Sequence, residues 1–231
     1  MKILLAILFF FTNCSKKNDG IHMSEQPVKK QLEYLALGDS YTIGEMVSAS
    51  ENFPNQTAAF LNSDSMNVNT RIIARTGWTS DELEAGITNA NNLDPLKNNY
   101  DFVTLLIGVN NQYRGRPVES YKPEFERLLS KAIYHTGNRP DRLVVLSIPD
   151  WGVTPFASGR DREQIAKKID AYNAVNKEIA ERYHVYYINI TPWTREAATD
   201  PSLLAADGLH PSGKEYKRWA EKIVTWMKSN L

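Results

Sequence analysis

The feature that most constrains the fold is an alternation of short apolar runs with longer segments of helical periodicity. The runs predicted as strands are Leu32–Gly38, Thr70–Ala74, Phe102–Ile107, Leu143–Ile148 and Val185–Ile190. The segments predicted as helices are Asn52–Leu61, Ser80–Asn89, Tyr121–Tyr134, Asp161–Tyr183 and Ser212–Ser229. Strands that alternate with helices form right-handed βαβ units around a parallel sheet. We therefore expect an α/β fold with a mainly parallel five-stranded sheet.

Charge and cysteine content exclude several classes of protein. The 231 residues carry 27 basic and 27 acidic side chains. Because nucleic-acid binding needs an excess or a stripe of basic residues, this balance argues against a nucleic-acid partner. The single cysteine excludes an intrachain disulfide and any multi-cysteine metal cage. No His-Glu-x-x-His or comparable ligand cluster is present, so we expect neither a metal nor another cofactor. The sequence leaves the oligomeric state open.

The N-terminal segment is typical of an export signal. Lys2 precedes an apolar run at residues 3–11, which is shorter than the roughly 20 residues of a membrane-spanning helix. Cys14 comes shortly after this run. The segment resembles bacterial lipoprotein precursors, which carry at this position the cysteine that becomes acylated. We expect a lipoprotein-type signal peptide at residues 1–13, a flexible tether at 14–31 and one domain at 32–231. Export, with a lipid anchor as the only membrane contact, is the expected location; an ordinary signal with an incidental cysteine is the alternative.

Polar or glycine-containing segments follow the predicted strands, and ligands of parallel sheets bind beyond the carboxyl ends of the strands. Gly38-Asp39-Ser40 ends the first strand, Gly77 follows the second and Asn110 follows the third. Asp207-Gly208-Leu209-His210 follows the fifth strand after one further loop. We expect these segments to meet at one cleft.

The residue types in these segments match nucleophilic catalysis. A serine hydroxyl is a weak nucleophile until a base takes its proton, and imidazole is the usual base. Asp207 lies three residues before His210, a spacing that allows it to fix one ring nitrogen while the other faces Ser40. The remaining histidines fit the tether or helix ends: His22, His135 and His184. We predict Ser40 as nucleophile, His210 as base and Asp207 as its orienting acid.

An attacked carbonyl also needs donors for its oxyanion. The Ser40 backbone N–H, the Gly77 backbone and the Asn110 side-chain amide are the candidates. Each segment alone is ordinary turn chemistry, whereas their order at successive strand ends favours a catalytic site.

Together these blocks resemble the SGNH (GDSL-type) esterase/lipase hydrolase superfamily, over residues 32 to about 228. The resemblance implies a flavodoxin-like three-layer α/β/α sandwich and metal-independent ester hydrolysis. It also implies the catalytic roles given above and an oxyanion hole of Ser40, Gly77 and Asn110. Tyr41 follows Gly38-Asp39-Ser40 where the family pattern has leucine, a replacement that many family members share. Asn111 stands where the family pattern has aspartate after Asn110. Because that aspartate is usually structural, the change concerns the support of the loop more than catalysis.

Two loops at the same sheet edge are the candidates for substrate binding. One carries Asn111, Tyr113 and Arg114, and the other carries Trp151 and Phe156. The aromatic residues suit a sugar ring or an acyl pocket, and Arg114 or Arg116 suits an acid group. The alternative for Trp151 and Phe156 is that they only pack their loop.

The sequence thus predicts serine-dependent hydrolysis of a small-molecule or carbohydrate ester through an acyl-enzyme, with a short acyl group such as acetyl. One alternative is a lysophospholipase or thioesterase acting on longer acyl chains, which membrane anchoring would suit. The other is a carbohydrate-binding lipoprotein with vestigial catalytic residues.

Overall fold

The computed structural model describes residues 29–63 and 66–231. The predicted signal peptide, Cys14, His22 and most of the predicted tether lie outside these residues. Within the described ranges, no helix combines the length and the apolar character needed to cross a membrane.

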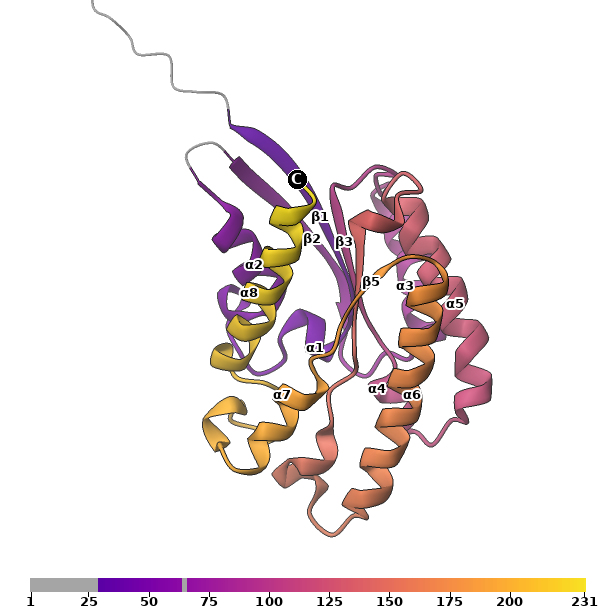
Figure 1. Cartoon of the computed structure of the whole chain (residues 1–231), viewed down its shortest axis with the longest axis vertical. Coiled ribbons are helices and arrows are strands. Elements are labelled where there is room, and N and C mark those ends of the chain that lie inside the picture. The colour runs from indigo at the N-terminus through magenta and orange to yellow at the C-terminus, as the bar shows by residue number, and fades with distance from the viewer. Residues whose placement is uncertain (1–28, 64–65) are drawn as a thin grey trace, which may run out of the picture.

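A single parallel sheet forms the centre of the domain (Figure 1). Its strands are β1 (Lys30–Asp39), β2 (Met66–Arg75), β3 (Phe102–Leu106), β4 (Leu143–Leu146) and β5 (Tyr186–Ile188). They lie in the order β2-β1-β3-β4-β5, and every neighbouring pair is parallel. This is the flavodoxin-like strand order, and it confirms the predicted fold class.

Helices cover both faces of the sheet (Figure 1). On one side lie the packed pair α2 (Phe53–Leu61) and α8 (Gly213–Ser229). On the other lie α3 (Ser80–Leu93), α5 (Val118–His135) and α6 (Arg162–Arg182), and α5 contacts both of its neighbours. The three-layer arrangement explains why the central strands read as continuous apolar runs, because both of their faces are covered.

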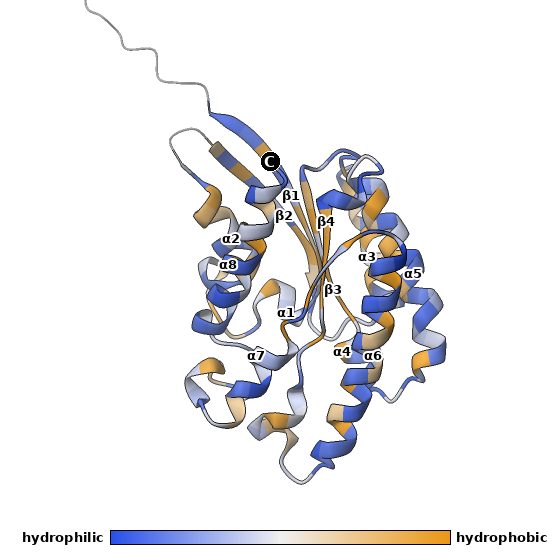
Figure 2. Ribbon diagram, viewed as in Figure 1, coloured by the Kyte–Doolittle hydropathy of each residue, from blue (hydrophilic) through white to orange (hydrophobic). Residues whose placement is uncertain are grey.

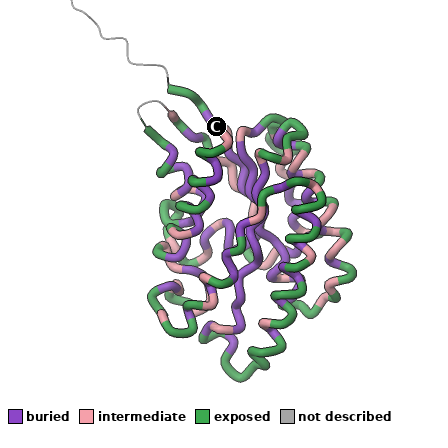
Figure 3. Tube along the Cα trace, in the orientation of Figure 1, coloured by how far each residue is buried: buried purple, intermediate pink, exposed green. Residues whose placement is uncertain are grey.

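The core lies between the sheet and these helices. Every residue of β3 and β4 is buried, and Figures 2 and 3 show the apolar, buried strands enclosed by helices with hydrophilic outer faces. Helix α8 turns Tyr216, Trp219, Ile223 and Met227 inward, all fully buried. Their spacing of three and four residues is the helical repeat that predicted this face.

Two strands, β1 and β2, begin earlier than the sequence predicted. Strand β1 begins at Lys30, so Lys30 and Gln31 pair with Met66 and Asn67 in the sheet and do not belong to a tether. Strand β2 begins four residues before the predicted Thr70. It is an edge strand whose exposed positions are polar, so an apolar run could not reveal its first residues.

Three short helices were not predicted: α1 (Ser40–Ile43), α4 (Val109–Tyr113) and α7 (Thr191–Arg195). Helices α1 and α4 begin directly after β1 and shortly after β3, so they stand at the carboxyl edge of the sheet. They carry the serine and asparagine of the predicted site.

Candidate active site

A cavity of about 160 Å³ lies beyond the carboxyl ends of the strands. Its walls include all the predicted catalytic and oxyanion residues except Asp207, namely Ser40, Gly77, Asn110 and His210. The topology therefore brings four separate segments of the chain to one place.

Ser40 owes its position to the turn from β1 into α1. Asp39 caps this helix, and its Oδ1 accepts a hydrogen bond of 3.0 Å from the Tyr41 backbone N–H. Ser40 is the first helical residue, so its own backbone N–H has no partner within the helix. Ser40 is buried and lines the cavity at the carboxyl edge of the sheet.

His210 connects Ser40 to Asp207. Its Nε2 lies 2.9 Å from Ser40 Oγ, and its Nδ1 lies 2.6 Å from Asp207 Oδ2. Partial burial raises the pKa of Asp207, but hydrogen bonds from the His210 ring and from the backbone of Leu209 and His210 hold it below the usual value. The ionised Asp207 carboxylate accepts a hydrogen bond from Nδ1–H of His210, which leaves Nε2 as the acceptor for the Ser40 hydroxyl.

The loop that carries Asp207 and His210 is fixed on both sides. The His210 carbonyl accepts a 2.7 Å bond from the Ala205 backbone, and Ser212 N donates to Leu203 O at 2.8 Å. The buried ring of Tyr41 packs against the imidazole with centroids 5.0 Å apart. The residue that replaces the usual leucine therefore supports the histidine.

Gly77 and Asn110 face Ser40 across the cavity. Gly77 adopts φ 83°, a left-handed conformation that glycine reaches without strain. Asn110 follows Gly108, where φ is 127° and a side chain would collide with the Tyr121 ring. The Asn110 amide donates to Trp78 O at 3.0 Å and, at 3.4 Å, to Asp39 Oδ2. A substrate oxygen can replace the longer of these contacts.

Asp39 is fully buried beside these groups. Burial raises the pKa of this carboxyl to about 7, although hydrogen bonds from the Tyr41 backbone and the Asn110 amide act in the opposite direction. Sequence reasoning treated Asp39 only as part of a turn. The 3.4 Å contact from the Asn110 side-chain nitrogen to Asp39 Oδ2 shows that Asp39 also holds the oxyanion asparagine.

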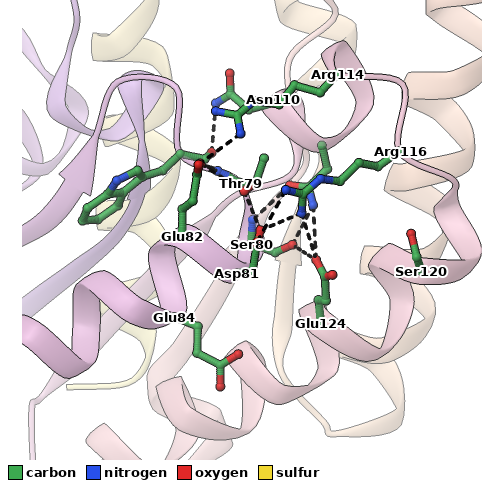
Figure 4. A network of polar contacts seen from close by, with 12 residues as sticks. Thr79, Ser80, Asp81, Glu82, Glu84, Asn110, Arg114, Arg116, Ser120 and Glu124 are labelled. Carbon is green, nitrogen blue, oxygen red and sulfur yellow. Dashed lines mark hydrogen bonds and ion pairs between the residues drawn. The ribbon is translucent and has the colours of Figure 1, made fainter.

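The prediction that Asn111 contacts substrate is wrong. Its side chain is fully buried, accepts from Ser80 N at 3.0 Å and donates to Ser80 Oγ at 2.7 Å and Glu124 Oε2 at 3.3 Å. Consecutive helical residues point about 100° apart, so when Asn110 faces the cavity, Asn111 faces the protein. Ser80 and Glu124 belong to the polar network of Figure 4, which joins α3 to α5.

Arg114 and Arg116, the candidates for binding an acid group, are held by acids of α3 in the structure. Arg114 donates to Gly77 O at 2.7 Å and to Glu82 Oε1 at 3.1 Å. Arg116 pairs with Asp81 at 2.6 Å (Figure 4). Neither residue lines the cavity. Both guanidinium groups are neutralised by acids of α3, and Arg114 braces the loop that carries Gly77.

The three predicted aromatic residues meet at the cavity wall. The Tyr113 ring centroid lies 5.2 Å from that of Trp151 and 6.1 Å from that of Phe156, and the Trp151 and Phe156 centroids are also 6.1 Å apart. Trp151 is buried and donates from Nε1 to Gln112 Oε1 at 2.7 Å, a partner that no sequence signal indicated. Tyr113 and Phe156 remain 42% and 44% exposed, so part of each side chain is accessible to solvent, although Arg160 lies over the Tyr113 ring.

Among residues 29–63 and 66–231, no group of three or more histidine, cysteine, aspartate or glutamate side chains is arranged to hold a metal ion. The chemistry that the described side chains can perform is proton transfer between Ser40 and His210, with Ser40, Gly77 and Asn110 close to the reacting oxygen.

The flavodoxin-like sheet and the hydrogen-bonded series of Ser40, His210 and Asp207 define a hydrolase of the SGNH class. The sequence model of the GDSL-like Lipase/Acylhydrolase family matches residues 36–218. The chain belongs to this family.

Solved structures share the fold at low sequence identity. The psychrotrophic esterase EstA from Pseudoalteromonas sp. is 15% identical, with a TM-score of 0.63 over 85% of this chain and 97% of that one. A lipase/acylhydrolase from Enterococcus faecalis is 20% identical, with a TM-score of 0.64 over 87% and 97%. The acetylxylan esterase Axe2 from Geobacillus stearothermophilus is 17% identical, with a TM-score of 0.63 over 85% and 94%. No curated protein sequence matches the chain.

Proposed function

We propose that the protein is a metal-independent serine esterase that removes short acyl groups, with acetyl esters of carbohydrates as the favoured substrates. The observation that carries this proposal is the 2.9 Å contact between Ser40 Oγ and His210 Nε2 inside a cavity that also holds Gly77 and Asn110. Family membership supports ester hydrolysis as the general reaction.

The residues suffice for a two-step reaction. Ser40 Oγ attacks the ester carbonyl while His210 Nε2 takes the hydroxyl proton, and Asp207 stabilises the imidazolium that forms. The backbone N–H groups of Ser40 and Gly77 and the Asn110 amide stabilise the oxyanion. His210 then returns the proton to the leaving alcohol. A water molecule, activated by the same histidine, releases the acid and restores Ser40.

The size and the lining of the cavity support a short acyl group. A volume of about 160 Å³ suits a small acyl group together with the ester linkage, whereas a fatty acyl chain needs a longer groove. The exposed ring of Phe156, which lines the cavity, suits stacking against a sugar ring. The similarity to the fold of an acetylxylan esterase is compatible with this substrate class.

A series of p-nitrophenyl esters from acetate to palmitate tests the acyl preference. We expect the highest kcat/KM at acetate or propionate, no loss of activity with EDTA, and acetate release from an acetylated polysaccharide. A maximum at long chains would contradict the proposal and favour the lysophospholipase or thioesterase alternative. Absence of turnover together with absence of fluorophosphonate labelling would favour a binding protein with vestigial catalytic residues.

We further propose that the protein is exported and anchored through Cys14. Lys2 and the apolar run at residues 3–11 support export through a signal peptide. The polar residues that follow Cys14 would serve as a spacer between the anchor and β1. Cells that express the full chain should incorporate an alkynyl palmitate analogue into it and retain it in the membrane fraction. The Cys14→Ser variant should lose both. Equal labelling of the variant would contradict the anchor.

A further inference from the structure

Arg160 lies beside the aromatic wall of the cavity. Its guanidinium carbon is 5.3 Å from the Tyr113 ring centroid and 5.5 Å from that of Trp151. Its Nη2 donates to the Tyr113 hydroxyl at 3.4 Å. Stacking on two rings is a favourable cation–π arrangement, and it holds an otherwise flexible side chain next to residues that line the Ser40 cavity.

The charge of Arg160 is not neutralised by a salt bridge. Within the described part of the chain no carboxylate pairs with it, whereas Arg114 and Arg116 are paired with Glu82 and Asp81. A guanidinium has five N–H donors in a planar fork. In Arg160 only one of them makes a hydrogen bond, to the Tyr113 hydroxyl. The exposed residue therefore keeps donors and charge for a ligand.

A second cation lies two residues further along. Arg162 is exposed, donates to Thr154 O at 3.2 Å and likewise has no salt bridge among the described residues. Asp161 stands between the two arginines, but its carboxylate caps α6 by accepting from Gln164 N at 2.9 Å. The Asp207 carboxylate is held by His210. Arg160, Asp161 and Arg162 together therefore carry a net charge of +1 (2 − 1).

We propose that Arg160 is an anion-binding subsite, so that the natural ester carries a carboxylate or phosphate on its alcohol portion. This inference rests on the proposed esterase function with a short acyl group, because such a group leaves only the alcohol portion to reach the cavity mouth. The planar fork matches the geometry of either anion. An acetylated acidic sugar, whose ring stacks on Phe156 while its acid group meets Arg160, is the substrate class that fits.

Matched acetate esters test the subsite. The neutral ester is para-acetoxybenzamide, and the anionic esters are para-acetoxybenzoate and para-acetoxyphenyl phosphate. Arg160→Gln should lower the ratio of anionic to neutral kcat/KM by about fivefold, the size expected for one exposed ion pair. Molar sodium chloride should reduce the difference, because salt screens exposed charges. Comparing the two anionic esters distinguishes a carboxylate ligand from a phosphate.

Lys222→Gln is the matched control. Lys222 is exposed on α8 beside a hollow formed with His184 and Tyr186, near the opposite ends of the strands, so this variant removes one charge away from the cavity. An unchanged ratio in Arg160→Gln, or an equal change in Lys222→Gln, would overturn the subsite even if all esters are hydrolysed. Failure of the wild type to hydrolyse the neutral ester would instead contradict the esterase function.

Discussion

The Asp39 carboxylate lies 3.4 Å from the side-chain nitrogen of Asn110 and joins the cap of the serine helix to the oxyanion side chain. The two residues follow β1 and β3, which are neighbours in the sheet. One buried acid therefore orients both sides of the cavity: its Oδ1 fixes the turn at Ser40, and its Oδ2 holds the Asn110 amide. A change at either residue should affect catalysis more than binding.

Replacement of Asn110 tests its role as an oxyanion donor. Asn110→Ala should lower kcat by about 10²–10³ with a small change in KM, because the lost bond is strongest in the transition state. Steady-state hydrolysis of p-nitrophenyl acetate measures the effect. Asn89→Ala, on the exposed face of α3, is the control and should retain full activity. An Asn110→Ala enzyme with wild-type kcat would remove this residue from the oxyanion hole.

The raised pKa of Asp39 makes stability depend on pH. The pKa of Asp39 is about 7 in the folded protein, whereas its ordinary value, which applies to the unfolded chain, is 3.8. The folded state therefore binds the proton more tightly than the unfolded state. The stability that comes from protonated Asp39 is complete below 3.8 and is lost as pH rises to about 7. At about 1.4 kcal/mol per pKa unit, the loss is at most about 4 kcal/mol.

The Asp39→Asn variant isolates this contribution, since asparagine can keep the helix cap without ionising. Urea unfolding across this pH range should show the wild type losing stability relative to Asp39→Asn. Parallel pH profiles of the two proteins would show that Asp39 does not titrate in this range.

The Asn111–Glu124 contact explains why this chain has asparagine where the family pattern has aspartate. Asn111→Asp would remove the amide that donates to Ser80 and Glu124 and place a carboxylate beside that of Glu124. We expect a loss of about 1–3 kcal/mol in unfolding free energy, the usual cost of an unsatisfied buried group. Glu124→Gln should restore part of it in the double variant. Additive effects of the two substitutions would contradict direct coupling.

The sequence predicted the parallel sheet and the positions of the catalytic segments because both depend on local patterns. The apolar composition of β3 and β4 indicates buried strands, and the helical spacing of apolar residues indicates the buried face of α8. The exposed half of β2 is polar at an open edge and carries no such pattern, so its start was missed.

Side-chain direction was harder to predict than position. Asn110 and Asn111 are adjacent in the sequence, yet one lines the cavity and the other is buried against Ser80. The role of Arg114 could not be predicted either, because Glu82, the acid that neutralises it, belongs to α3, more than thirty residues away. Only the packing of α3 against α4 and its loop decides which cation remains available.

The central claim is that Ser40 is the nucleophile, and fluorophosphonate labelling with and without Ser40→Ala tests it most directly. The wild type should form one covalent adduct, located to Ser40 by peptide mass analysis, with loss of p-nitrophenyl acetate hydrolysis in parallel. Ser40→Ala should keep the wild-type circular dichroism spectrum but show neither labelling nor enzymatic turnover. A folded Ser40→Ala protein that still hydrolyses the ester at the wild-type rate would contradict the account.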